Sequence, residues 1–280
     1  MIRKFIICIL MIIGLSASLG LLNAQSQAPT PATLGAIPAQ AQAQNLRLTV
    51  LYDNIVYDNR YKSDWGFAAL IEYGGRTLLF DSGAKGAILL ENMKKLDVDL
   101  KSIEMVVLSH AHTDHIGGLD ELLKEGIRPT VYMLSSFPNY LKESARHQTG
   151  LVEIEKPLEI IPGIFTTGSI NINNISEQGL VIRTRSGAVI LTGCAHPGLL
   201  RIVDKAQEIM PGKIVLLAGG FHLLDKNAAE LRSIINQLGR KEIEEVMPSH
   251  CTGDKAISMF QKEFAGDFVK GGVGRVMVIR

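Results

Sequence analysis

Four potential metal ligands lie within one six-residue segment, namely His110, His112, Asp114 and His115. They directly follow the apolar run 105–108, which is typical of a short buried strand. Residues two apart in an extended segment point the same way, so His110 and His112 can hold one ion, and Asp114 and His115 can reach a second. Imidazole and carboxylate suit zinc, with manganese or iron as alternatives. The segment therefore predicts a site for two divalent ions, against the simpler interpretation of a polar loop with surface histidines.

Hydrophobic periodicity predicts the elements that must position these side chains. Gly74-Gly75 and Ser186-Gly187 each separate two apolar runs, which indicates two hairpins. Asn227 and Glu230 predict a capping box at the start of a helix. Strands are expected at 46–52, 67–73, 76–80, 105–108, 130–134, 180–183, 188–191, 214–218, 245–247 and 276–279, and helices at 88–96, 138–146, 199–209, 227–238 and from 254 onward. Each half of the chain has a hairpin followed by strand–helix units. This order predicts an α/β fold of two packed sheets with helices outside.

The histidine segment and its surroundings resemble the metallo-β-lactamase superfamily. Residues 109–118 read Ser-His-Ala-His-Thr-Asp-His-Ile-Gly-Gly, and residues 80–83 (Phe-Asp-Ser-Gly) resemble the upstream Asp-x-Gly element. Segments 179–182, 191–198, 219–223 and 248–253 are similar to one subgroup, the 7,8-dihydropterin-6-methyl-4-(β-D-ribofuranosyl)-aminobenzene 5′-phosphate synthases. The resemblance runs from about residue 46 to the C-terminus. It implies a four-layer αββα sandwich with the metal site at the sheet edge.

Two further positions take their expected roles from this resemblance. Asp81 would be a carboxylate that orients a ligand histidine, because its strand delivers it to the same sheet edge as His110. The alternative is a turn-forming aspartate before Ser-Gly. Where the superfamily carries an aspartate that bridges both ions, this chain has Cys194. A thiolate can also bridge ions, since metal binding deprotonates it, but Cys194 could equally be a small buried hydrophobic residue.

The remaining ligand candidates depart from the usual pattern of the superfamily. The superfamily usually has a histidine in a Pro-Gly-His-Thr segment, whereas residues 162–166 read Pro-Gly-Ile-Phe-Thr. His196, two residues from Cys194, is expected to replace it as a ligand. His222 could be a ligand, a catalytic acid or base, or a substrate contact, and His250 stands where the family places its last ligand. Each could instead be a hydrogen-bonded structural histidine. Cys251 is either a packed neighbour of His250 or the partner of Cys194 in a disulfide.

The N-terminal segment predicts export. Residues 1–24 combine two early basic residues with an uncharged apolar run, which is typical of a signal peptide, and a periplasmic or secreted location follows. An uncleaved membrane anchor is the alternative. Residues 25–45 form an Ala/Gln/Pro-rich linker, and 46–280 the folded domain. The net charge of +1 gives no indication of a nucleic-acid partner. We expect a small-molecule substrate and no stable membrane association after cleavage; the oligomeric state is left open.

The expected activity is metal-dependent hydrolysis of a small phosphorylated or ester-type metabolite. Two ions about 3.5–4 Å apart can share a hydroxide and hold both the attacking and the leaving oxygen. Asp114 would orient the nucleophile, and His222 or a water would protonate the leaving group. One alternative is a synthase-like transferase on the same site, as the subgroup name implies. Another is a protein that binds metal without catalysis.

Overall fold

The structure is a computed structural model that describes residues 44–280. These residues belong to one compact unit, Ala41–Arg280. The expected signal peptide (1–24) lies outside the described residues, and so does the expected linker (25–45) except for its last two positions. The first strand begins at Leu46. No helix within 44–280 has the length and apolar character needed to cross a membrane.

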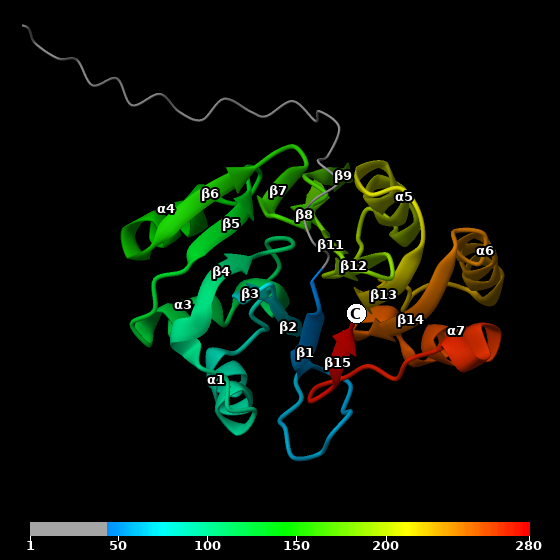
Figure 1. Cartoon of the computed structure of the whole chain (residues 1–280), viewed down its shortest axis with the longest axis horizontal. Coiled ribbons are helices and arrows are strands. Elements are labelled where there is room, and N and C mark those ends of the chain that lie inside the picture. The colour runs from blue at the N-terminus through cyan, green and yellow to red at the C-terminus, as the bar shows by residue number, and fades with distance from the viewer. Residues whose placement is uncertain (1–43) are drawn as a thin grey trace, which may run out of the picture. The chain divides into compact units, whose positions relative to one another are not determined.

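The first sheet has seven strands in the order β15-β1-β2-β3-β4-β5-β6 (Figure 1). Strands β15 to β3 pair antiparallel, and β3 to β6 pair parallel. Their bounds are β1 Leu46–Asp53, β2 Phe67–Tyr73, β3 Arg76–Phe80, β4 Ile103–Val107, β5 Thr130–Leu134, β6 Gly150–Ile154 and β15 Val276–Ile279. Strands β3 and β4 therefore end at the same edge, where Asp81 and His110 follow them.

The second sheet has six strands in the order β14-β13-β12-β11-β8-β7. Strands β12, β13 and β14 are parallel neighbours, and the others pair antiparallel. Their bounds are β7 Leu158–Ile161, β8 Ile164–Thr166, β11 Leu180–Arg183, β12 Ala188–Thr192, β13 Ile214–Gly220 and β14 Ile243–Ser249; β9 Ile170–Ile172 and β10 Ile175–Glu177 form a separate two-stranded ribbon. The parallel trio delivers Cys194, His222 and His250 from adjacent strand ends.

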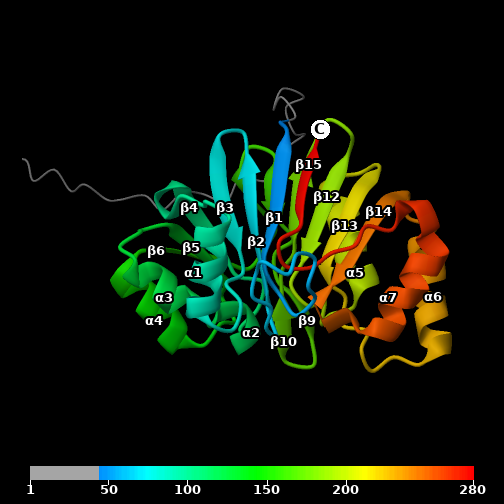
Figure 2. The same cartoon turned by 90° about the horizontal axis from the view of Figure 1, so that it is seen from below.

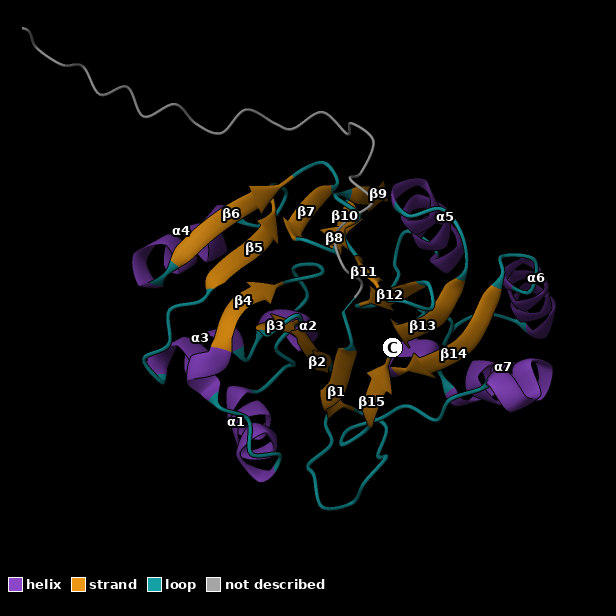
Figure 3. Cartoon of the chain, viewed as in Figure 1, coloured by secondary structure: helices purple, strands orange, loops and turns teal. Residues whose placement is uncertain are grey.

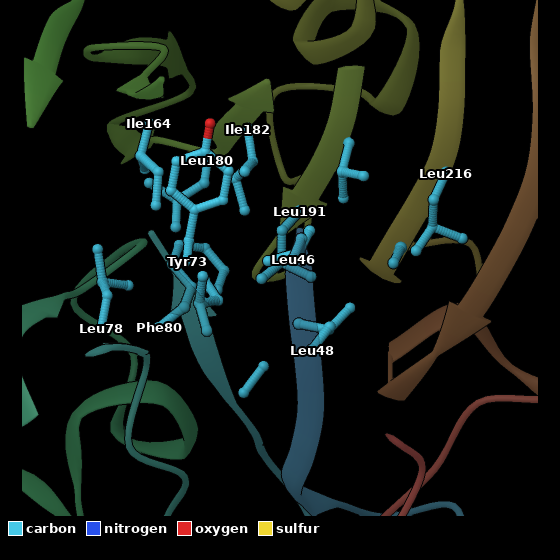
Figure 4. Packing of buried hydrophobic residues seen from close by; sticks show 14 of the residues in the cluster. Leu46, Leu48, Tyr73, Leu78, Phe80, Ile164, Leu180, Ile182, Leu191 and Leu216 are labelled. Atoms are coloured by element: carbon cyan, nitrogen blue, oxygen red, sulfur yellow. The ribbon is translucent and has the colours of Figure 1, made fainter. Parts of the chain in front are cut away.

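Three buried clusters show the layers. Between the sheets, alternate residues of strands from both sheets share one buried cluster, which includes Leu46 and Leu48 of β1 and Leu180 and Ile182 of β11 (Figure 4). The outer face of the first sheet is covered by α1 Gly86–Lys95, α3 Leu119–Lys124 and α4 Asn139–Gln148. The outer face of the second is covered by α5 Leu199–Ile209, α6 Ala228–Leu238 and α7 Asp254–Phe264 (Figure 3). The predicted αββα sandwich is confirmed.

Most predicted elements form where expected, and the predicted capping box of Asn227 and Glu230 is present at α6. Strands β6 to β10 were not predicted, and the helix expected to follow the histidine segment forms as two short helices, α2 Thr113–Ile116 and α3. Helix α2 begins inside the histidine segment and carries Asp114 and His115. Figure 2 shows α2 at the same end of the sandwich as the β9–β10 ribbon. The candidate ligands lie at that end.

Candidate metal centre

Three histidines form a first ligand group: His110, His112 and His196. The Nδ1 atom of His112 lies 3.1 Å from His110 Nε2 and 3.1 Å from His196 Nε2. All three ligand atoms lie within 4.8 Å of one another. His110 and His112 come from the loop between β4 and α2, and His196 follows β12, so two sheets contribute. Three imidazole nitrogens facing one point match a zinc site with an open fourth position.

A second ligand group lies beside the first and consists of Asp114, His115, Cys194 and His250. His115 Nε2 is 3.1 Å from Cys194 Sγ and 3.6 Å from Asp114 Oδ2. His250 Nε2 is 3.4 Å from the same Asp114 oxygen. The rings of His110 and His115, one from each group, have centroids 4.2 Å apart. Two adjacent groups of this kind have the arrangement of a two-metal site.

The donor atoms fit metal ions better than they fit one another. His250 Nε2 is buried and has no hydrogen-bond partner, a costly arrangement unless an ion accepts its lone pair. Burial, aided by neighbouring histidines, holds the pKa of His110 well below its usual range. The same causes lower the pKa of His196 to about 3. Ligand histidines must be neutral to bind metal, so the first group is prepared for an ion at neutral pH.

Asp81 contacts a ligand candidate, as the orienting role expected of it requires. It lies fully buried after β3, and its Oδ2 is 2.7 Å from His115 Nδ1. Asp81 also accepts hydrogen bonds from the backbone nitrogen and the hydroxyl of Ser109, both at 2.7 Å. A proton on His115 Nδ1 leaves Nε2 free to face Asp114 and Cys194. Gly193 is needed here, because a Cβ at that position would lie 2.1 Å from Ser109 Oγ.

Replacing Asp81 with asparagine is expected to weaken zinc binding by about 10–100-fold, the usual cost of losing a carboxylate behind a ligand histidine. The side-chain amide of the variant would point an N–H at one of the three groups that now donate to the carboxylate, namely His115 Nδ1 and the backbone nitrogen and hydroxyl of Ser109. Competition with a chromophoric chelator measures the affinity. Asp97→Asn is the control, because Asp97 is exposed and belongs to none of the ligand groups. Equal zinc affinity for Asp81→Asn and the unmodified chain would contradict the assigned role.

Glu177 is a functional candidate that the sequence did not reveal. Fully buried at the end of β10, it accepts hydrogen bonds from the backbone nitrogens of Cys194 at 2.8 Å, Ala195 at 2.7 Å and His196 at 2.8 Å. Burial raises its pKa to about 7, against the lowering effect of these three bonds. Ala195 is held in the left-handed region at φ 62°. Glu177 thus fixes the turn that presents one ligand to each group.

His250 has its own support from the end of β1, which was also not predicted. Asn54 Oδ1 lies 2.7 Å from His250 Nδ1, and Asn54 Nδ2 donates to the His250 carbonyl at 3.0 Å. Asp53 Oδ1 accepts from the His250 backbone nitrogen at 3.2 Å. These bonds orient Nε2 toward the second group. No motif surrounds Asp53-Asn54, and the contact spans almost the whole domain, so sequence patterns carried no signal for it.

The backbone is strained at several of these strand ends. Asp81, Ala195, His222 and His250 all have positive φ values, between 44° and 62°. Non-glycine residues adopt this region at a cost, and such residues concentrate at functional sites. Five more non-glycine residues of the described chain have positive φ away from the site, but these four lie together at the strand ends that carry or adjoin the candidate ligands. Their backbone conformation helps to aim these side chains.

An open pocket of about 570 Å³ adjoins the ligand groups, and its lining includes Trp65, Lys85, His112 and Asp114. The ring centroid of Trp65 lies 5.0 Å from that of His250. The volume of this pocket is in the range of small-molecule sites. The pocket gives a substrate access to both groups.

The structure also places the remaining sequence candidates. His222 is in neither ligand group; its ring centroid is 4.1 Å from that of His196, and its ligand atom groups with Cys194 and Cys251. It is absent from the pocket lining described above. Both cysteines are free thiols, so the disulfide alternative is not formed.

Comparisons with known proteins agree with this architecture. The profile of the metallo-β-lactamase superfamily matches residues 66–250. The chain is 30% identical to the 7,8-dihydropterin-6-methyl-4-(β-D-ribofuranosyl)-aminobenzene-5′-phosphate synthase of Methanocaldococcus jannaschii, covering 84% of this chain and 97% of that protein.

Two solved structures are similar over most of the chain. Tm1679, a metal-dependent hydrolase of the β-lactamase superfamily, superposes with a TM-score of 0.70 at 28% identity, covering 83% of this chain and 98% of that one. YhfI of Bacillus subtilis, a metallo-β-lactamase fold protein, gives a TM-score of 0.64 at 16% identity, covering 83% and 99%, and shows the fold alone. The superfamily expected from the histidine segment is confirmed: the chain belongs to the metallo-β-lactamase superfamily.

Proposed function

We propose that this protein is a metal-dependent hydrolase that uses two divalent ions, zinc in the first instance, on a small phosphorylated or ester-type metabolite. The observation that carries the proposal is the pair of adjacent ligand groups, three histidines beside Asp114, His115, Cys194 and His250. Both groups border a pocket of small-molecule size. When bound, two divalent ions supply Lewis acidity and bring the pKa of water toward about 7.

In this proposal Asp114 would orient the attacking water. Burial raises its pKa, but the adjoining imidazoles of His250 and His115 outweigh burial, and the net pKa lies well below its usual range. Asp114 is therefore an anion at neutral pH, able to accept a hydrogen bond and unable to act as an acid. Asp114 also lines the pocket, so its carboxylate can reach both the metal ligands and a water that attacks a substrate bound there.

The pocket residues would orient the substrate. Trp65 offers an aromatic face beside His250, with 47% of its surface exposed. Lys85 also lines this pocket and pairs at 2.6 Å with Asp64, another lining residue. The two metal ions would therefore supply the attraction for an anionic substrate group such as phosphate.

The test is turnover by the full chain loaded with zinc, manganese or iron, on a generic phosphodiester, a phosphomonoester and a carboxylic ester. The expected result is at least about two ions per chain and hydrolysis of a phosphorus ester that stops when a chelator removes the metal. A chain that holds its ions and hydrolyses none of the three would refute the hydrolase proposal.

A second candidate is a synthase-like transferase, which the 30% identical relative from Methanocaldococcus jannaschii favours by its name. The same ligand groups and pocket could serve a condensation of two phosphorylated or aromatic substrates. Formation of a joined product by the metal-loaded chain, without hydrolysis of the three esters, would select this alternative.

Export remains part of the proposal. Arg3 and Lys4 precede an uncharged run at 5–22, as in secretory signals. Mass spectrometry of the N-terminus after expression in a bacterial host is expected to find the mature chain beginning at Gln25, in a periplasmic or secreted fraction. An intact Met1 in a membrane fraction would favour the anchor instead.

A further inference from the structure

Three residues near the metal centre form a third group that neither ligand group explains: Cys194, His222 and Cys251. Their ligand atoms all lie within 4.8 Å of one another. Cys194 is shared with the second ligand group, whereas His222 and Cys251 belong to neither. Both cysteines are free and buried, and His222 is exposed at the edge of the group.

The sheet topology brings these three side chains together. In the parallel trio of the second sheet, Gly220 of β13 is paired with Ser249 of β14, and the residues two positions further are His222 and Cys251. Thr192 of β12 is paired with Gly219, and Cys194 follows two positions after Thr192. The carboxyl ends of adjacent parallel strands are where binding sites form. Extended by two residues, this register aligns His222 with Cys251, and Cys194 stands one residue out of step, beside the turn at Ala195.

The backbone leaves room for Cys251 to face Cys194. A Cβ on Gly220 would lie 2.9 Å from Cys251 Sγ and 3.1 Å from the His250 ring, so a side chain there would displace both. Cys251 Sγ lies 3.5 Å from the Cys194 carbonyl oxygen. His222 adopts φ 49°, a left-handed conformation that turns its ring back over the strand ends. Each of these features keeps the two sulfurs and the imidazole close.

We propose that Cys194, His222 and Cys251 form a third metal position, which takes zinc through two sulfurs and one imidazole. Two thiolates and a histidine are a preferred zinc set, and the exposed side of His222 leaves a fourth position for water. A thiolate carries several lone pairs, so Cys194 can bind this ion and the ion of the second group together.

Such an ion would link the ends of β12, β13 and β14. It would also fix the sulfur of Cys194 between the second and third positions. In this assignment His222, expected as a ligand or as the proton donor, serves as a ligand. The inference depends on the proposed metal pair only through Cys194, and it does not depend on the reaction catalysed.

The test compares zinc content and Zn–S contacts in the full chain, purified with a thiol reductant, and in two variants, Cys251→Ser and His222→Ala. Elemental analysis counts zinc per chain, and X-ray absorption spectroscopy counts sulfur neighbours per zinc. We expect about one zinc more per chain in the unmodified protein than in either variant. Zn–S contacts should fall from roughly one per zinc to roughly half that in Cys251→Ser.

If Cys251→Ser does not fold, His222→Ala still tests the proposal, because His222 is exposed and its removal leaves the core intact. His147→Ala is the matched control, since it also removes an imidazole and lies exposed on α4. Zinc and sulfur counts that stay equal in both variants would overturn the third position while leaving the metal pair intact. Oxidation of Cys194 and Cys251 to a disulfide in the purified chain would also overturn it, and a chain that binds no zinc would remove both proposals.

Discussion

A full-length chain in which His112 is replaced by alanine is expected to lose the ion of the first ligand group and, with it, measurable hydrolysis. His112 Nδ1 is the atom common to both short contacts, 3.1 Å from His110 Nε2 and from His196 Nε2. Without it, two imidazoles remain, which is too few for a stable zinc site. The loss of zinc affinity should exceed the 10–100-fold expected for residues that only support a ligand.

Zinc per chain after dialysis against a weak chelator, together with turnover of a generic phosphodiester, measures this effect. His147→Ala is the matched control, because it also removes an imidazole but lies exposed on α4, outside every ligand group. It should keep both metal and turnover. Full retention of zinc by His112→Ala would show that the three-histidine group is not a metal site, whatever the fold.

A second consequence concerns folding without metal. His112 is an exposed side chain, and its removal costs the buried His110 Nε2 one hydrogen-bond partner, so metal-free His112→Ala should lose no more than about 1–3 kcal/mol of its free energy of unfolding. With zinc present, only the unmodified chain should gain the full stability that binding to the native state provides. The comparison separates the loss of a ligand from damage to the fold.

The parts of the fold that were predicted are those where local patterns and tertiary packing agree. Residues 67–73 and 76–80 alternate or run apolar on both sides of Gly74-Gly75, and both flanking strands form as expected. The parts that were missed lie where burial is incomplete. Strand β7 Leu158–Ile161 is exposed at two of its four positions, and β6 Gly150–Ile154 is an edge strand with only Ile154 buried. Such segments lack the hydrophobic period that identifies a strand.

The candidate site divides in the same way. The segment from His110 to His115 was evident because its ligands are close in sequence. Which groups they form was not, because that depends on contacts across the chain: His196 joins His112 over 84 positions, and Asn54 supports His250 over 196. The supporting residues Glu177 and Asn54 have ordinary sequence surroundings. Only the packing of the two sheets determines that their oxygens face the ligand turns.

Replacing Glu177 with alanine is expected to lower both the stability of the domain and its affinity for zinc. Three backbone N–H groups, those of the buried Cys194 and Ala195 and of the half-buried His196, would lose their common acceptor. Since an unsatisfied buried donor costs about 1–3 kcal/mol, the two buried groups alone should lower the free energy of unfolding by at least about 2 kcal/mol. Urea unfolding of the metal-free chain measures this loss, and chelator competition measures the zinc affinity.

Glu177→Gln separates the positioning role from general disruption. An amide has nearly the same shape, but its single oxygen can replace only one of two acceptors: Glu177 Oε1 receives the Cys194 and Ala195 nitrogens, and Oε2 that of His196. An amide oxygen facing the first two leaves an N–H directed at the His196 nitrogen. The glutamine variant should therefore keep most of its stability yet bind zinc about 10–100-fold more weakly, because the turn presenting Cys194 and His196 is no longer fixed. Glu155→Gln, at an exposed position of the same half of the chain, should change neither quantity. If Glu177→Gln lowered stability and left zinc affinity intact, Glu177 would be a structural anchor of the fold with no part in placing the ligands.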